Sequence, residues 1–488
     1  MSEAFKESYL IPSPSKISEL REIIRSHSPP SATLLSRSEN VVDNGSLELA
    51  RYTTEIQTLE ETLAKLKSER ALLESYAHEC RSIFSPARRL PTELLVEIFD
   101  LCSPDFNSVN TVEQEENRLA KTYLFHISRV CYRWHDIIMN SPKLWSTITV
   151  DTGLWHESAI SSATLLASSL KRGADFPLTL KAGINPRHLS HQSVLELLAQ
   201  HSRRWKTVCL WLYPSHLTFL AHARGNIPVL ETLILHSTHP DNVEPTAEVF
   251  TAAPRLKMAK IFGFGPSFPS LPWGQLLQLT IGNGQCHTLS LKMLPLLSTE
   301  ARCTLALFPA KLKLPLNLPF VTSGIASLDI GFNGERNKTD DLRAGEALGE
   351  IFHTLSLPSL RHLSIFGAHG GPPPVWNVLR FLDFASRSML CNTLRSFKVH
   401  SIITDVEILD SFRVLPLLEE LQIADADKEH TVITDRLLQQ LTWQVGPGEP
   451  HSTSPGSRLA HTGDFSEESF LEFASSRIVA GRSGCWAI

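Results

Sequence analysis

The sequence lacks the features that mark membrane, nucleic-acid-binding and disulfide-rich secreted proteins. No stretch approaches about 18 consecutive apolar residues, and the N-terminus has no charged start followed by an apolar core, so we expect neither a membrane span nor a signal peptide. Lysine and arginine form no long run and the formal net charge is -5, which argues against nucleic acid or a membrane surface as partner. The 8 cysteines are scattered, as in a reducing compartment, so we expect no disulfides and a cytoplasmic or nuclear location.

The sequence also lacks the short motifs that carry catalysis. It has no Cys-x-x-Cys, His-Glu-x-x-His, P-loop or Gly-x-Ser-x-Gly pattern. His188 and His191 share a short segment, but no third zinc ligand is identifiable, so two surface histidines are the better interpretation. The turn Gly263-Phe264-Gly265 lacks the third glycine and the helix start of a dinucleotide site. We therefore predict no catalytic residue, no metal site and no cofactor.

What the sequence does contain is a helical pattern between residues 90 and 145. Pro91 suits the first position of a helix, and Glu93 lies near the positive end of the helix dipole. Two apolar stripes with the spacing of one helix face follow. They consist of Leu94, Leu95, Ile98, Leu101 and Cys102, and of Ile127, Val130, Cys131, Trp134 and Ile138. Two short helices cannot bury both stripes alone, so the stripes must pack on each other, on the segment with Leu144 and Trp145, or on a partner protein.

This segment resembles the F-box family, in which a Leu-Pro opening, a Leu/Ile helix, a Val-Cys-x-x-Trp helix and a closing Leu-Trp form a small helical module. The residues that carry the resemblance are Leu90, Pro91, Leu94, Leu95, Ile98, Val130, Cys131, Trp134, Leu144 and Trp145. The resemblance implies binding to a Skp-type adaptor, which would join the chain to the cullin scaffold of a ubiquitin ligase. It also implies that the adaptor contact, or the packing behind it, is carried by Leu90, Pro91, Leu94, Leu95, Ile98, Val130 and Trp134.

One departure concerns the link between the two helices. Residues 103–124, which include an acidic run, make this link longer than in the compact form of the F-box motif. A surface loop tolerates such an insertion, but the motif then does not fix the pose of the second helix. The alternative interpretation is an ordinary helical pair inside a larger helical domain.

The N-terminal region changes character near residue 45. Residues 1–45 are rich in Ser and Pro and hold little periodic apolar content, so we predict a disordered tail. Residues 46–86 carry a heptad pattern typical of a coiled coil. Its seam consists of Leu49, Tyr52, Ile56, Leu59, Leu63, Leu66, Arg70, Leu73, Ala77, Cys80 and Phe84. Two interpretations remain open, a homodimer through this helix or one helix that folds back on its own F-box-like segment.

After Trp145 a short pattern recurs, with apolar residues at its first, fourth and sixth positions. Its instances are Trp205/Val208/Leu210, Leu230/Leu233/Leu235, Leu256/Ala259/Ile261, Leu276/Leu279/Ile281, Ile325/Leu328/Ile330, Leu360/Leu363/Ile365, Leu394/Phe397/Val399 and Leu418/Leu421/Ile423. Leu305 and Leu307 mark a further member. The pattern resembles leucine-rich repeats, in which stacked units share a continuous core. Because the spacing varies and the expected Asn appears only as Asn333, we predict an irregular solenoid; the alternative is an ordinary α/β domain.

These patterns predict an α/β fold made of a coiled-coil helix, a small helical module and an irregular leucine-rich-repeat-like solenoid. The predicted domains are a disordered tail at 1–45, the heptad helix at 46–86, the F-box-like module at 87–150, the solenoid at 151–444 and a polar tail at 445–488. An amphipathic stretch from Phe465 to Ile478 would cap the solenoid.

The C-terminus places Cys485 four residues from the end, as in a prenylation signal. Trp486 is not aliphatic, Ile488 is not a usual last residue, and no second membrane signal lies nearby. We therefore favour coincidence over prenylation.

The inner face of a solenoid is its natural binding surface, because positions three, five and seven of each unit point away from the core. Exposed aromatic residues among scattered charges are typical anchors of protein interfaces. The candidates for contact with a target protein are Trp211, His236, Lys260, Phe262, Asp329, His362, Phe366, Lys398 and His400. The alternative is that Trp211, Phe262 and Phe366 pack beneath neighbouring loops.

The sequence thus predicts a non-catalytic substrate receptor of a ubiquitin ligase, which would mark an unknown target protein for degradation by holding it near the ligase. Two alternatives come from other classes. A scaffold protein without any link to ubiquitin is disfavoured by the Leu-Pro opening and by Trp134 and Trp145. An enzyme within the α/β region is disfavoured because no motif has the required spacing.

Overall fold

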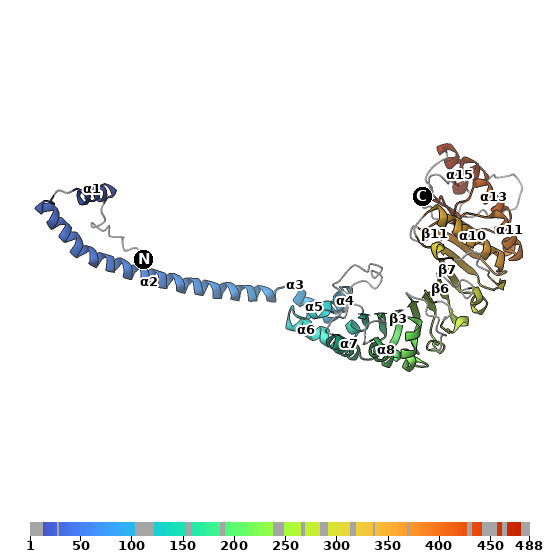
Figure 1. Cartoon of the computed structure of the whole chain (residues 1–488), viewed down its shortest axis with the longest axis horizontal. Helices are drawn as coiled ribbons and strands as arrows, with labels where there is room; N and C mark the ends of the chain where they lie inside the picture. The colour runs from blue at the N-terminus through green and yellow to red at the C-terminus, as the bar shows by residue number, and fades with distance from the viewer. Residues whose placement is uncertain are drawn as a thin grey trace. The chain divides into compact units, whose positions relative to one another are not determined.

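The computed structural model describes residues 13–26, 29–102, 122–152, 159–185, 191–237, 248–264, 269–283, 291–312, 319–334, 337–367, 371–426, 432–441, 456–460 and 466–479. The chain divides into two compact units, Met1–Pro91 and Thr92–Ile488. The fold is mixed α/β, with a long helix in the first unit and an open parallel sheet in the second (Figure 1).

The first unit is built of helices, α1 (Pro14–Arg25), α2 (Ala32–Ile83) and α3 (Pro86–Arg89). Ser31 caps α2, and its hydroxyl accepts a hydrogen bond from the Leu34 amide at 3.4 Å. The prediction of a disordered tail up to residue 45 is therefore corrected, because α1 and the start of α2 lie within it. The sequence analysis missed this helix because the segment is rich in polar residues. Such residues can form hydrogen bonds within a helix, and the Ser38 hydroxyl, for example, donates one to the Leu34 carbonyl at 2.8 Å.

The second unit begins with short helices, α4 (Thr92–Leu101), α5 (Thr122–Ser128), α6 (Tyr132–Met139) and the 3-10 turn η2 (Pro142–Trp145). The helix predicted at Pro91 is confirmed and begins one residue later. The second predicted helix is wrong as a single helix, since the chain leaves helical geometry between α5 and α6. Cys131 is extended there, with φ −161° and ψ 164°. Most of the long link before α5 lies outside the described residues.

A 12-stranded parallel sheet forms most of the second unit, and its strand order follows the order of the chain. The strands are β1 (Thr147–Asp151), β2 (Leu178–Gly183), β3 (Trp205–Trp211), β4 (Thr232–His236), β5 (Met258–Phe262), β6 (Gln278–Asn283), β7 (Arg302–Leu307), β9 (Ser327–Phe332), β11 (His362–Gly367), β12 (Ser396–His400), β13 (Glu420–Ala424) and β14 (Gly456–Ala460). A two-stranded sheet pairs β8 (Val321–Thr322) with β10 (Leu355–Ser356). The large sheet is not closed, because β1 and β14 each have one strand neighbour.

Helices and turns connect the strands and cover one face of the sheet. They are α7 (Ala159–Arg172), α8 (His191–Gln200), η4 (Ser202–Arg204), η5 (Pro214–Ala223), η6 (Trp273–Gln275), η7 (Leu294–Leu296), η8 (Pro309–Lys311), α10 (Lys338–Thr354), α11 (Val378–Arg387), α12 (Leu390–Thr393), α13 (Asp405–Arg413), α14 (Asp435–Leu441) and α15 (Glu467–Val479). Strand residues alternate between the two faces. In β4, for example, Leu233 and Leu235 are buried in the core, whereas Ile234 and His236 lie on the opposite face and are partly exposed.

The predicted repeat pattern locates strands correctly. Every instance falls on a strand or its start, and the residues at its fourth and sixth positions are buried. In β7, however, the register places Cys303 and Leu305 at these positions rather than the predicted Leu305 and Leu307. The strands β1, β2 and β14 escaped the pattern. In β2 the register places Leu180 and Ala182 at the fourth and sixth positions, and the first position is Pro177.

The sheet extends beyond the predicted limits of 151–444 at both ends. β1 begins at Thr147, and β14 ends at Ala460 and pairs in parallel with β13. The helix predicted near the C-terminus is confirmed as α15, which contacts α14. Cys485 lies outside the described residues. Within the part of the chain that the structure describes, no helix has both the length and the apolar character needed to cross a membrane.

Candidate functional site

Helix α4 presents apolar side chains on two sides. Leu95 and Phe99, four residues apart, are each 1% exposed. Leu94, Ile98 and Leu101 share a second stripe of the helix and are 50%, 42% and 84% exposed. We call these three residues the α4 ridge. Because large apolar side chains gather on one helix stripe at the surface, the ridge is a candidate for contact with another protein.

The buried side of α4 packs against α6. The rings of Phe99 and Trp134 meet edge to face, with centroids 5.0 Å apart and an interplanar angle of 63°. Ile137 and Ile138 of α6 are also buried. Trp145 closes the module, because its indole Nε1 donates a hydrogen bond to the Ile138 carbonyl at 2.7 Å. The tryptophans therefore hold the helices together from within.

The polar side of α4 is tied to η2 by Lys143. Its Nζ lies 2.5 Å from Glu97 Oε1 and 3.4 Å from Asp100 Oδ2. The hydrogen bond that the Lys143 ammonium donates to Glu97 is the main cause that raises the pKa of Lys143 above its ordinary value. Glu97 is exposed and Lys143 and Asp100 are partly exposed, so the ion pairs orient η2 without adding much stability.

The residues predicted for adaptor binding separate into two groups. Leu94, Ile98 and Val130 are exposed and available to a partner, whereas Leu95 is buried and Trp134 is partly buried against Phe99. Leu90 and Pro91 directly precede α4 in the chain, and Leu90 is the C-cap of α3. The sequence analysis did not assign Leu101 and Tyr132 to the surface, although both are exposed. The spacing of Leu101 from Leu94 and Ile98 was the signal that would have found it.

The face of the sheet that points away from the core carries stacked aromatic rings. Trp211, His236 and Phe262 are neighbours in the strand register. The ring centroids of Trp211 and His236 lie 4.9 Å apart, and those of His236 and Phe262 lie 4.6 Å apart. Lys181 Nζ lies 5.3 Å from the Trp211 ring centroid at one end of the stack. At the other end, a side chain on Gly282 would overlap the Phe262 ring and displace it from its present position.

Charge and burial keep this stack uncharged at neutral pH. Burial, followed by the positive charges of Lys181 and Lys260, lowers the pKa of His236 to about 4. Burial also raises the pKa of the neighbouring Cys209 thiol to about 12. The imidazole is therefore neutral and the thiol protonated, so Cys209 is not an activated nucleophile.

The same face carries ion pairs farther along the chain. Asp329 Oδ2 accepts hydrogen bonds from Arg302 Nε at 2.6 Å and from Thr304 Oγ1 at 3.2 Å. Asp329 lies on the predicted face but is only 6% exposed, which corrects its expected availability to a target. Lys398 Nζ pairs with Glu420 Oε1 at 3.1 Å. The remaining candidates differ in exposure, with His362 exposed and Phe366 and His400 partly exposed.

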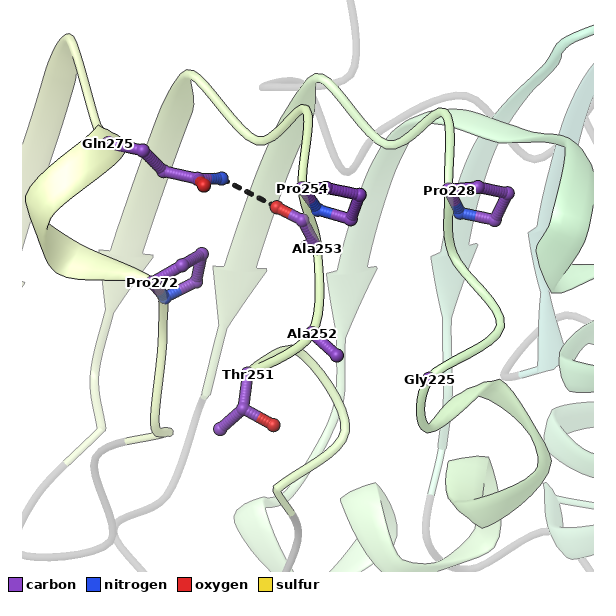
Figure 2. Close-up of a pocket in the computed structure, with 8 residues that line it drawn as sticks. All are labelled: Gly225, Pro228, Thr251, Ala252, Ala253, Pro254, Pro272 and Gln275. Carbon is purple, nitrogen blue, oxygen red and sulfur yellow. Dashed lines mark hydrogen bonds between the residues drawn. The ribbon is translucent and has the colours of Figure 1, made fainter.

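A pocket of about 350 Å³ is lined by residues of the loops that lead into successive strands. Figure 2 shows these lining residues. They are Gly225, Pro228, Thr251, Ala252, Ala253, Pro254, Pro272 and Gln275. The Gln275 side-chain amide donates to the Ala253 carbonyl at 2.6 Å and to the Leu256 carbonyl at 3.1 Å. With no carboxylate, imidazole, thiol or amine in its lining, the pocket lacks the groups of acid-base chemistry.

No cluster of histidine, cysteine and carboxylate side chains among the described residues could hold a metal ion. His188 lies outside the described residues, and His191 begins α8.

Comparison with known proteins bears on the helical module. No curated protein matches the chain. Residues 87–151 match the family model F-box-like, which covers α4, α5, α6, η2 and β1 and so includes the α4 ridge. The chain therefore carries an F-box-like domain, and such a domain supports binding of a Skp-type adaptor of ubiquitin ligase complexes.

Proposed function

We propose that the chain is the substrate-recognition subunit of a Skp-cullin-F-box type ubiquitin ligase. It docks a Skp-type adaptor through the F-box-like module and a target protein through the sheet region. The observation that carries the proposal is the α4 ridge, an exposed apolar stripe within the segment that matches the F-box-like model.

The sheet region is proposed to be an irregular leucine-rich-repeat-like solenoid. Its support is the topology, because each strand lies beside the next strand of the chain in one parallel sheet. Stacked units of one strand and one returning segment produce this order. The target would lie on the open face, where Trp211, His236, Lys260 and Phe262 are partly exposed.

The receptor is proposed to catalyse nothing itself. It would hold a target beside the ligase and so raise the effective concentration of target lysines near the loaded ubiquitin carrier. We place this activity in the cytoplasm or nucleus, with degradation of the target as the outcome. We also propose that the heptad seam of α2 joins two copies of the receptor.

The adaptor contact is tested by copurification of the full chain with a Skp-type adaptor and a cullin. We expect Leu94→Glu combined with Ile98→Glu to lower the recovered adaptor at least about tenfold, because two charges would be desolvated at the contact. The matched control is Leu379→Glu, which places the same charge at another exposed leucine, on α11. The double variant Leu90→Ala with Pro91→Ala is also expected to lose the adaptor while the chain stays folded.

Two results would contradict the proposal. Undiminished recovery of the adaptor with the α4 double variant would remove the ridge as the docking surface. A wild-type chain that recovers neither adaptor nor cullin would favour a scaffold protein with no link to ubiquitin.

A further inference from the structure

Helix α2 carries an apolar seam whose residue types favour one relative orientation of two paired copies. None of the 52 residues of α2 is buried. The seam leucines and isoleucine from Leu49 to Leu73 are between 51% and 67% exposed. The seam alternates between two heptad positions, a (Leu49, Ile56, Leu63, Arg70, Ala77, Phe84) and d (Tyr52, Leu59, Leu66, Leu73, Cys80). A seam of this length is typical of a helix that pairs with another helix.

A parallel pair in register would oppose like charges. In that arrangement each a residue faces the same residue of the partner, so Arg70 would face the partner's Arg70 inside the seam. The flanking positions g and e would also meet across the pair. They would bring Glu55 to the partner's Glu60 and Glu69 to the partner's Glu74, and like charges at such positions destabilise a coiled coil.

An antiparallel pair removes these conflicts. Each a residue then faces a d residue of the partner, and one register matches the whole seam from Leu49 to Cys80. Its layers are Leu49 with the partner's Cys80, Ile56 with the partner's Leu73, Leu63 with the partner's Leu66, Arg70 with the partner's Leu59, and Ala77 with the partner's Tyr52. The small Ala77 meets the large Tyr52, which favours even packing along the seam.

The flanking charges agree with the same register. Two e positions meet across the antiparallel pair, and they bring Lys67 to the partner's Glu60 in both halves of the dimer. Arg70 lies at the level of the partner's Glu60 as well, so its guanidinium also has a carboxylate of opposite charge nearby. In one helix Arg70 Nε pairs with Glu74 Oε1 at 2.9 Å, but both side chains are exposed and this pair is easily exchanged.

We propose that α2 forms an antiparallel two-stranded coiled coil between two copies of this chain, with Leu49 of one copy against Cys80 of the other. The inference rests on the homodimer proposed above and fixes its orientation. The shared segment would be about 45–50 Å long, and the two chains would leave it at opposite ends.

Charge reversal tests the orientation in the full chain by analytical ultracentrifugation. Glu60→Lys would place two lysines together in the antiparallel pair, so we expect the dimer dissociation constant to rise about tenfold. Combining Glu60→Lys with Lys67→Glu should restore the wild-type value. A parallel pair predicts the reverse, because Glu60→Lys would relieve repulsion from Glu55 and tighten the dimer. The matched control is Glu61→Lys, which lies outside the seam and should change the constant less than about twofold.

Disulfide trapping gives an independent measurement. Under oxidation, Leu49→Cys should form a disulfide between position 49 and the partner's Cys80, identified by mass spectrometry of the linked peptides. Adding Cys80→Ser should abolish that link. A link between the two Cys80 residues, or no link to position 49, would overturn the orientation. A monomer at all concentrations would overturn the dimer as well, while adaptor copurification would still report separately on the proposed receptor function.

Discussion

Leucine side chains have opposite environments in the sheet and in helix α4. Leu233, Leu363 and Leu421 of the sheet are buried among the helices and turns of their own chain. Leu94 and Leu101 of α4 are exposed, although they also follow a regular apolar pattern. The difference lies in the covering elements, since crossover segments pack above the core face of the sheet, whereas in the described part of the chain α6 and η2 contact α4 and leave the α4 ridge exposed.

This contrast shows what an apolar period can and cannot indicate. The period states which side chains share a face, because it follows from the geometry of a helix or strand. It does not state whether the face is covered within the chain or by a second protein. A leucine removed from the sheet should therefore weaken folding, and a leucine removed from α4 should weaken association.

The largest expected effect is on the stability of the sheet. Leu363→Ala removes a fully packed side chain from the centre of the core, and we expect the free energy of unfolding to fall by about 3–5 kcal/mol. Urea denaturation followed by circular dichroism measures this loss. Leu379→Ala on the exposed side of α11 removes the same atoms and should cost less than about 0.5 kcal/mol. Equal losses of unfolding free energy in the two variants would contradict the expected difference between leucines that are covered within the chain and leucines that are exposed.

The core of the sheet was the most predictable part of the molecule. Strand residues such as Leu328 and Ile330 are apolar at alternate positions. In a parallel sheet with a single packed face, this alternation identifies the residues that point into the core. β1 fits the same pattern, with Ile148 and Val150 at its fourth and sixth positions, but its first position is Trp145, which the sequence analysis assigned to the F-box-like segment. In β2 the first position is Pro177, so the series of three apolar residues is incomplete there.

Two features of the candidate sites could not be read from local sequence. The break at Val130 and Cys131 depends on how α5 and α6 pack, and a helical period runs through it without interruption. The burial of Asp329 depends on Arg302, which belongs to the neighbouring strand β7. Both outcomes depend on residues that are close in space but belong to another element, and no single repeat unit contains that information.

The next expected effect concerns the open face and depends on pH. His236 takes up a proton near pH 6.5 when unfolded but only near a pKa of about 4 when folded. Between these values the unfolded state binds more protons, so the free energy of unfolding should fall as the pH drops from 6.5 to 4. Because the imidazole is only partly buried, we expect a loss on the order of 1 kcal/mol.

Urea denaturation of His236→Phe tests this dependence, since phenylalanine preserves the stack and does not titrate. Its unfolding free energy should change less than that of the wild type over the same pH interval. An identical pH dependence of the unfolding free energy in the two proteins would show that the His236 imidazole is solvated enough to keep its ordinary pKa. The open face would then be more accessible to water than the stacked geometry indicates.

The smallest expected effect on stability belongs to the α4 ridge. Leu101→Ala removes an exposed side chain at the end of the helix, so the free energy of unfolding should change by less than about 0.5 kcal/mol. The affinity for a Skp-type adaptor should nevertheless fall about fivefold or more, because the leucine would lose apolar contact that forms only in the complex. Isothermal titration calorimetry with purified adaptor measures this affinity, and Leu379→Ala supplies the control. A Leu101→Ala protein that unfolds as easily as Leu363→Ala would mean that the ridge is already covered within the chain, and the two regions would then use leucine alike.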